Sequence, residues 1–246
     1  MTYRSLPWDE VLRRAADAGL RTIEWGADVH APSGDASRLA EVRDATAGYG
    51  LRVAAYGSYF RAGPHGAEEF APVLAGAVAL GAPRIRIWAG TLGSALADPD
   101  AVAAVVRRSR EAAERAADQG VELGFEFHRN TLTDTVDSTL RLLDAVDQPN
   151  VSTYWQPPVG APDDEAVANL EAVRDRVCAL HVFSWWPETE RLRLAERREL
   201  WRRVFAVAGD ASWDALLEFV PDDDPELLDG EAATLAELLG ADRTAG

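Results

Sequence analysis

Lysine is absent from this chain, and all 25 of its basic residues are arginine. Schiff-base aldolases, pyridoxal-phosphate enzymes and phosphate-loop nucleotide binders each need a lysine amine, so these classes are excluded. Cysteine is nearly absent, since Cys178 is the one example and lies within an apolar run. A disulfide scaffold and a cysteine-zinc site are therefore excluded as well.

Positive charge and long apolar runs are also scarce. The formal net charge is −16, which disfavours a surface for nucleic acid or for an anionic membrane. No apolar stretch approaches the roughly 18 residues of a membrane span, and the first residues lack a signal-peptide core. We therefore expect a cytoplasmic protein whose partner is a small molecule, with no nucleic acid and no membrane. The sequence leaves open a homo-oligomer.

What the chain does contain is a regular alternation of short apolar strands with amphipathic helices. Together with a length of 246 residues, this alternation predicts one α/β domain over residues 1–246, a (β/α)8 TIM barrel. Only residues 2–4 precede the first helix, so the first strand is either short or truncated at its start. The alternative is an open sheet with a dinucleotide crevice, but no G-x-G-x-x-G follows a predicted strand. Strands are expected at 20–25, 51–56, 84–88, 121–127, 151–155, 177–183 and 213–220, and helices at 5–18, 36–49, 68–80, 100–119, 133–146, 164–173, 196–207 and 226–239.

Four apolar segments of the second half each carry one side chain able to bind a divalent metal. The residues are Glu126, Gln156, His181 and Glu218, at intervals of 30, 25 and 37 residues, about the length of one βα unit. In a closed barrel, strands at this spacing would bring the four side chains to one rim. Three oxygen donors and one imidazole suit a single Mn²⁺ or Mg²⁺ ion.

Each of these residues has a second interpretation. Glu126 and Glu218 could be buried or rim carboxylates paired with an arginine, although a carboxylate without a partner seldom lies inside an apolar strand. His181 could be a hydrogen-bonded core residue. Gln156 precedes two prolines and could simply cap the end of its strand.

A further set of polar and aromatic residues falls at or just after predicted strand ends, where barrels keep their sites. Aromatic rings there can stack on a sugar, and polar groups can bind its hydroxyls. The alternative is ordinary packing at the rim. The predicted substrate-binding residues are Glu24, His30, Tyr56, Trp88, His128, Trp155 and Arg191.

The chain resembles the xylose-isomerase-like barrel family of sugar isomerases and epimerases. The resemblance rests on residues 18–25, on residues 81–88 and on the strands of Glu126, His181 and Glu218. Similarity to the ketose 3-epimerases implies that Glu126, the residue at position 156, His181 and Glu218 hold one divalent ion. Those enzymes carry aspartate where this chain has Gln156, so the site loses one negative charge.

The resemblance implies proton transfer beside a carbonyl through an enediolate, with Glu126 and Glu218 as base and acid on opposite faces of a ketose or related polyol. Three alternatives stay open: a metal-dependent lyase or dehydratase on a sugar-like substrate, a non-catalytic sugar-binding barrel, and a subunit of a complex. An abasic-site nuclease of the same family would need a histidine-rich three-zinc cluster, which four histidines and a charge of −16 argue against. The absence of lysine favours an unphosphorylated substrate.

Overall fold

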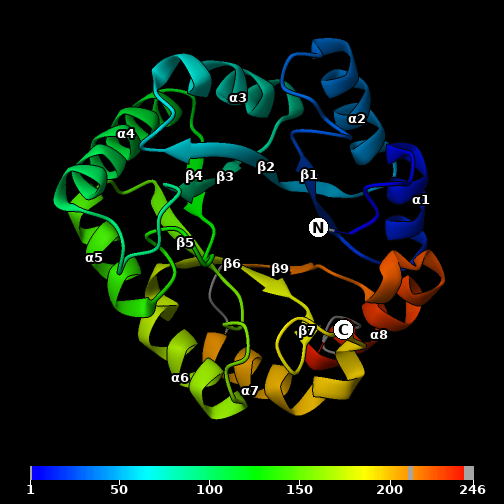
Figure 1. The fold of residues 1–246 in the computed structure, drawn as a ribbon. Helices are drawn as coiled ribbons and strands as arrows, with labels where there is room; N and C mark the ends of the chain where they lie inside the picture. Colours follow the sequence, from blue (N-terminus) through cyan, green and yellow to red (C-terminus); the bar gives the residue numbers. More distant parts are fainter. Residues whose placement is uncertain (1, 210–212, 241–246) are drawn as a thin grey trace. The chain divides into compact units, whose positions relative to one another are not determined.

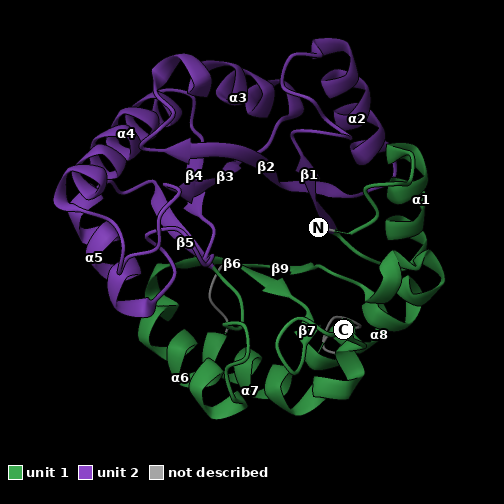
Figure 2. Ribbon diagram, in the orientation of Figure 1, with its two compact units in different colours: residues 1–21, 155–246 green, residues 22–154 purple. Residues whose placement is uncertain are grey.

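The protein is described by a computed structural model that covers residues 2–209 and 213–240. The chain folds into two compact units, shown in Figure 2. Unit 2 comprises Thr22–Tyr154, and unit 1 comprises Met1–Arg21 with Trp155–Gly246. The predicted single domain over 1–246 includes residues 1, 210–212 and 241–246, which lie outside the described residues. The extent of the domain stays a prediction.

Unit 2 is a parallel sheet with strand order β1-β2-β3-β4-β5 and helices between the strands. Helices α2 to α5 lie along one side of these strands (Figure 1). Along each strand, alternate side chains therefore face the helices, and the others point to the opposite side of the sheet. The elements are β1 (Thr22–Gly26), α2 (Ala36–Gly48), β2 (Arg52–Ala62), α3 (Ala67–Leu80), β3 (Arg84–Ala89), α4 (Pro99–Ala117), β4 (Glu122–Phe125), α5 (Val136–Val146) and β5 (Val151–Trp155).

Local sequence signals set the helix ends of unit 2. The side chains of Asp35, Asp98 and Thr135 each accept a hydrogen bond from a backbone N–H in the first turn of the following helix. Gly81 ends α3 with φ of 73°, a left-handed conformation that glycine adopts without a steric penalty. The helix boundaries predicted from sequence in this unit agree with the structure to within three residues because these signals are local.

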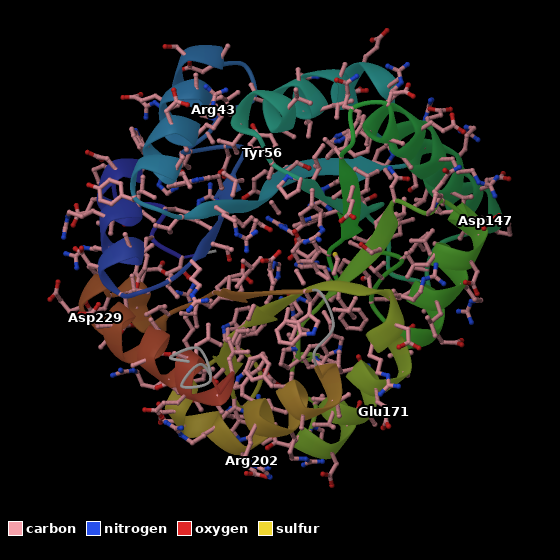
Figure 3. All side chains as sticks on the ribbon, turned by 180° about the vertical axis from the view of Figure 1, so that it is seen from behind. Arg43, Tyr56, Asp147, Glu171, Arg202 and Asp229 are labelled. Atoms are coloured by element: carbon pink, nitrogen blue, oxygen red, sulfur yellow. The ribbon has the colours of Figure 1, made fainter. Side chains whose placement is uncertain are left out.

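Unit 1 contains two parallel strands, β6 and β9, a short antiparallel hairpin and four α-helices within its described part. A small core of Tyr3, Val220 and Leu228 joins the start of the chain to its last helix. Exposed polar residues such as Glu171, Arg202 and Asp229 lie on the helices of this unit (Figure 3). The elements are α1 (Trp8–Asp17), α6 (Asp163–Val173), η1 (Arg174–Arg176), β6 (Val177–Val182), β7 (Ser184–Trp185), β8 (Arg191–Leu192), η2 (Leu194–Arg197), α7 (Arg198–Ala208), β9 (Asp214–Leu217), η3 (Pro221–Asp223), η4 (Pro225–Leu227) and α8 (Leu228–Leu238).

The strands differ from the sequence prediction at several points, and β4 and β9 are shorter than predicted. Strand β2 runs six residues past its predicted end at Tyr56, to Ala62. Residues 2–4 form no strand, so the short first strand that the sequence predicts is not found among the described residues. The hairpin of β7 and β8 was not predicted. Among the described helices, none combines the length and the apolar character that crossing a membrane requires.

Candidate metal and substrate site

In unit 1 three of the four predicted metal ligands come together. The Nδ1 atom of His181 lies 3.0 Å from Oε1 of Gln156 and 3.4 Å from Oε2 of Glu218. With its proton on Nδ1, the imidazole donates to the amide oxygen. The imidazole of His181 thus contacts both an amide and a carboxylate.

The strands of unit 1 explain this convergence. His181 lies in β6, and Glu218 directly follows β9, which pairs with β6 in parallel. The backbone N–H of Glu218 donates to the carbonyl of Val182 at 2.9 Å, so the ladder continues one residue beyond β9. The imidazole is 2 % exposed. The side chains are therefore fixed by backbone pairing at the carboxyl ends of the strands, where barrels keep their sites.

These three donors fit a hard or borderline divalent ion. Amide and carboxylate oxygens and a neutral imidazole are ligands that Mn²⁺ and Mg²⁺ accept, and the set contains no thiolate that would favour a softer metal. Among the described residues, no group of three or more histidine, cysteine, aspartate and glutamate side chains gathers at one point. Such a group would be completed by an aspartate where this chain has Gln156.

Unit 2 contains a network of charge in which Glu126 pairs with an arginine, as in its second interpretation from the sequence, while the arginine itself and its other partners were not predicted. The guanidinium of Arg86, a residue that is 3 % exposed, donates to Oε1 of Glu24 at 2.8 Å and to Oε2 of Glu126. The hydroxyl of Tyr154 donates to the other oxygen of Glu24 at 2.9 Å. Arg86 thereby compensates part of the charge of two carboxylates that would be costly to bury without a partner.

Gly57 provides the space for this network. It faces Arg86 in the register of β2 and β3. A Cβ at this position would lie 2.6 Å from Oε1 of Glu24 and 2.9 Å from Nη2 of Arg86. The glycine in the middle of a strand therefore marks a close approach of charged side chains to the backbone.

Glu126, the fourth predicted ligand, belongs to unit 2. Its backbone N–H donates to Ile87 at 2.9 Å and its carbonyl accepts from the hydroxyl of Thr133 at 2.6 Å, so the residue is held on both sides. Oε2 contacts Arg86, and no hydrogen bond to Oε1 is found among the described residues. That Glu126 shares one metal with the three donors of unit 1 stays a prediction.

An aromatic layer lies at the carboxyl ends of β2, β3 and β4. The rings of Trp88 and His128 stack at 4.6 Å with 23° between their planes, and Tyr59 lies 6.3 Å from Trp88. The guanidinium carbon of Arg61 lies 3.7 Å above the Trp88 ring. Burial lowers the pKa of Arg61 below its ordinary value, and the nearby charge of Glu126 acts in the opposite direction.

Two of the predicted substrate-binding residues are packed in the core. Tyr56 has no exposed surface, its hydroxyl donates to the carbonyl of Ala31 at 2.6 Å, and burial raises its pKa (Figure 3). Trp155 is also fully buried, and its indole N–H donates to Asn169 at 3.0 Å. These contacts give both residues packing roles, and contact with substrate stays a prediction for them.

The remaining predicted residues are partly exposed. His30 follows β1 and sets its ring 5.9 Å from that of Trp25, edge to face. Arg191 donates to Asp223 at 3.0 Å and lies over the ring of Phe219. Arg191 is thereby held by the loop after β9 within unit 1.

Sequence reasoning missed Arg86, Tyr154 and Arg61. A signal for Arg86 was present, because an arginine between Ile85 and Ile87 in a buried strand must find a carboxylate. Arg61 was missed because β2 was expected to end at Tyr56. No sequence signal marked the hydroxyl of Tyr154.

Comparison with known proteins gives a family match over most of the chain. The family model described as xylose isomerase-like TIM barrel matches residues 12–228. A 3-dehydroshikimate dehydratase of Bacillus anthracis is 43% identical over 68 residues, which are 28% of this chain and 24% of that enzyme. The aligned segment is thus about a quarter of the relative's length.

Solved structures show the same fold at low sequence identity. The probable 3-DHS dehydratase of petrobactin synthesis from Bacillus anthracis superposes with a TM-score of 0.80 at 20% identity, over 94% of each chain. A D-psicose 3-epimerase with D-tagatose from Clostridium cellulolyticum H10 gives 0.73 at 17%, over 95% of this chain and 94% of that one. A xylose isomerase-like barrel protein of Mycobacterium smegmatis in complex with magnesium gives 0.69 at 18%, over 97% and 90%. The predicted parallel α/β barrel class is confirmed.

Proposed function

This chain belongs to the xylose isomerase-like TIM barrel family, and we propose that it catalyses metal-dependent proton transfer at a carbon beside a carbonyl, as an isomerase or epimerase of a ketose or related polyol. The contact of Gln156, His181 and Glu218 supports this proposal most directly. The solved structures similar to this chain include a D-psicose 3-epimerase, and another of them was solved with magnesium.

The proposed metal ligands are Gln156, His181 and Glu218, with Glu126 as the fourth as the sequence predicts. When bound, a divalent ion would supply a positive charge that stabilises negative charge developing on the substrate's oxygens. With Gln156 where the ketose 3-epimerases carry aspartate, the ligands offset less of the ion's positive charge. We expect weaker binding of the ion as the result.

Glu126 and Glu218 are the proposed proton-transfer groups. One carboxylate removes the proton beside the carbonyl, and the conjugate acid of the other returns a proton to the opposite face, which inverts that carbon. Arg86 holds Oε2 of Glu126, so the proton would move through Oε1. In this arrangement Arg86 positions the carboxylate and lowers the cost of its burial.

Solvent exchange tests the proposal. The metal-loaded protein is incubated in D₂O with a panel of ketoses and aldoses, and deuterium at or next to the carbonyl carbon is measured by NMR. We expect incorporation with Mn²⁺ or Mg²⁺ and its loss in Glu126→Gln and in Glu218→Gln.

Glu122→Gln is the matched control for Glu126→Gln. Glu122 lies at the opposite end of β4, is exposed and pairs with Arg84, so its substitution should leave exchange unchanged. Equal exchange in Glu126→Gln and Glu122→Gln would remove Glu126 from the reaction. No exchange of any sugar with metal bound would favour a binding protein, and recovery of exchange in Gln156→Asp would identify Gln156 as the cause.

A dehydratase is the second candidate, favoured by the local similarity to 3-dehydroshikimate dehydratase. The first step is the same removal of a proton beside the carbonyl. The electron pair then forms a carbon–carbon double bond and expels a β-hydroxyl, which leaves as water after protonation by the second carboxylic acid. Growth of ultraviolet absorbance from the conjugated carbonyl product, without return of deuterium to substrate, would distinguish this outcome from epimerisation.

A further inference from the structure

Arg61 differs from the other arginines of unit 2 that are partly or fully buried. Arg38, Arg84, Arg86 and Arg108 each contact a carboxylate within this unit. Arg61 is partly buried, and no carboxylate of the described residues lies within ion-pair distance of it. Burying even part of a guanidinium without an ion pair has a cost, and this chain has 41 acidic residues that could have supplied a partner.

The surroundings of Arg61 fix the position of its guanidinium. Among the described residues, most of its N–H donors have no acceptor. One face of the guanidinium lies over the Trp88 ring, which in turn stacks on His128. A guanidinium has five N–H donors, and within the part of the chain that the structure describes Arg61 makes one long side-chain hydrogen bond, 3.4 Å to the carbonyl of Gly90. The backbone is also fixed, since the N–H of Arg61 donates to Nδ1 of His65 at 3.0 Å.

The position of Arg61 links it to the proposed chemistry. It faces Trp88 in the register of β2 and β3, at the carboxyl ends of these strands. The register shifts between Gly57 and Arg61, so an irregularity in β2 directs the residues at its end. Glu126 of the same unit is near enough for its charge to act on Arg61.

We propose that Arg61, held on the Trp88–His128 stack, binds a carboxylate of the substrate, so that the substrate is a polyhydroxylated carbonyl acid in place of a neutral sugar. This inference rests on the proposed function for the carbonyl chemistry and on Arg61 for the acid. A guanidinium edge matches a carboxylate with two parallel hydrogen bonds. Phosphate sites of barrels use helix N-termini and several donors, whereas the stack offers one guanidinium.

Equilibrium binding tests the inference without turnover. D-gluconate and D-glucitol differ by one carboxylate in place of one hydroxymethyl group, and D-glucitol 6-phosphate carries the alternative anion. Their affinities for the metal-loaded full-length protein are measured by calorimetry in the wild type, in Arg61→Gln and in Arg61→Lys. Arg52→Gln is the matched control, because Arg52 is an exposed arginine at the other end of β2.

We expect gluconate to bind more tightly than glucitol and to lose about tenfold or more in affinity in Arg61→Gln, the loss of one charge-assisted contact. Arg61→Lys should lower the affinity for gluconate less, and Arg52→Gln should leave it unchanged. The affinity for glucitol should be the same in all of these variants. Equal or unmeasurable binding of gluconate and glucitol by the wild type would overturn the inference, as would equal losses in Arg61→Gln and Arg52→Gln. Preference for the phosphate would also overturn it in favour of a phosphorylated substrate. Because no turnover is needed, failure of solvent exchange with intact gluconate binding would count against the proposed reaction alone.

Discussion

In unit 2 the partly buried carboxylate of Glu24 and the buried one of Glu126 share a fixed positive charge, the guanidinium of Arg86. In unit 1 the carboxylate of Glu218 faces the imidazole of His181, which also contacts the amide of Gln156. The first set is neutralised in part by the protein itself. The second set consists of groups that bind a metal when the imidazole is neutral. Unit 2 thus holds a permanent cation of the protein, and unit 1 holds the groups that we propose bind an exchangeable one.

Removal of the permanent cation should have the largest effect. Arg86→Met leaves Glu24 and Glu126 buried without their shared partner, which should lower the free energy of unfolding at neutral pH by about 3–5 kcal/mol in urea titrations. Arg141→Met is the control, since Arg141 and Asp137 are exposed, and it should cost about 0.5 kcal/mol or less. Addition of Glu24→Gln to Arg86→Met should restore part of the loss. Equal losses of unfolding free energy in Arg86→Met and Arg141→Met would contradict the role of the network.

Crowding the same network should cost less. Gly57→Ala places a methyl group against Glu24 and Arg86, so the ion pair must shift, and we expect a loss of about 2 kcal/mol in unfolding free energy. Gly48→Ala is the matched control at a helix end with nothing within 4 Å of the new Cβ, and it should be neutral or slightly stabilising. Thermal melts of both variants give the answer. A neutral Gly57→Ala would mean that the pair has room to move.

An added negative charge should strengthen the binding of the proposed metal ion. Gln156→Asp should tighten the binding of Mn²⁺ roughly tenfold in calorimetric titrations, because one more negative charge faces the ion. Gln119→Glu adds the same negative charge at an exposed glutamine after α4, and it should leave the affinity unchanged. Identical Mn²⁺ affinity in wild type and Gln156→Asp would show that position 156 does not face the metal.

The hydroxyl of Tyr154 should have the smallest effect. Tyr154→Phe removes a hydrogen bond of 2.9 Å to Glu24, and we expect a loss of about 1 kcal/mol in unfolding free energy. Tyr49→Phe, at an exposed tyrosine after α2, should change nothing measurable. A loss in Tyr154→Phe that persists after Glu24→Ala has removed the acceptor would assign the effect to packing.

The sequence predicted the fold and the approach of three side chains, through two contacts, because both depend on regular spacing. One metal-binding residue per strand end is enough to anticipate that His181 meets Glu218 and Gln156. The network of Arg86 was missed because its partners, Glu24 and Tyr154, are 62 and 68 residues away from it and no local pattern joins them. Arg61 was missed because the shift of register in β2 depends on pairing with β3.

Packing also determined the orientation of residues whose side of the sheet the sequence pattern did not predict. Tyr56 and Trp155 end predicted strands, and from sequence either face of the sheet was available to them. In the structure they are fully buried with their polar atoms bonded to Ala31 and Asn169. Alternation along a strand gives two faces, but which face meets the helices is set by the tertiary structure.

An anomalous diffraction map of crystals grown with Mn²⁺ tests the central claim most directly. We predict a single strong peak in contact with Gln156, His181 and Glu218, and the same map should show whether Glu126 joins them or stays with Arg86. A His181→Ala crystal grown in the same way should lose the peak. A map with no peak at these residues in the wild type, or with the manganese bound elsewhere, would contradict the account of a metal-dependent site.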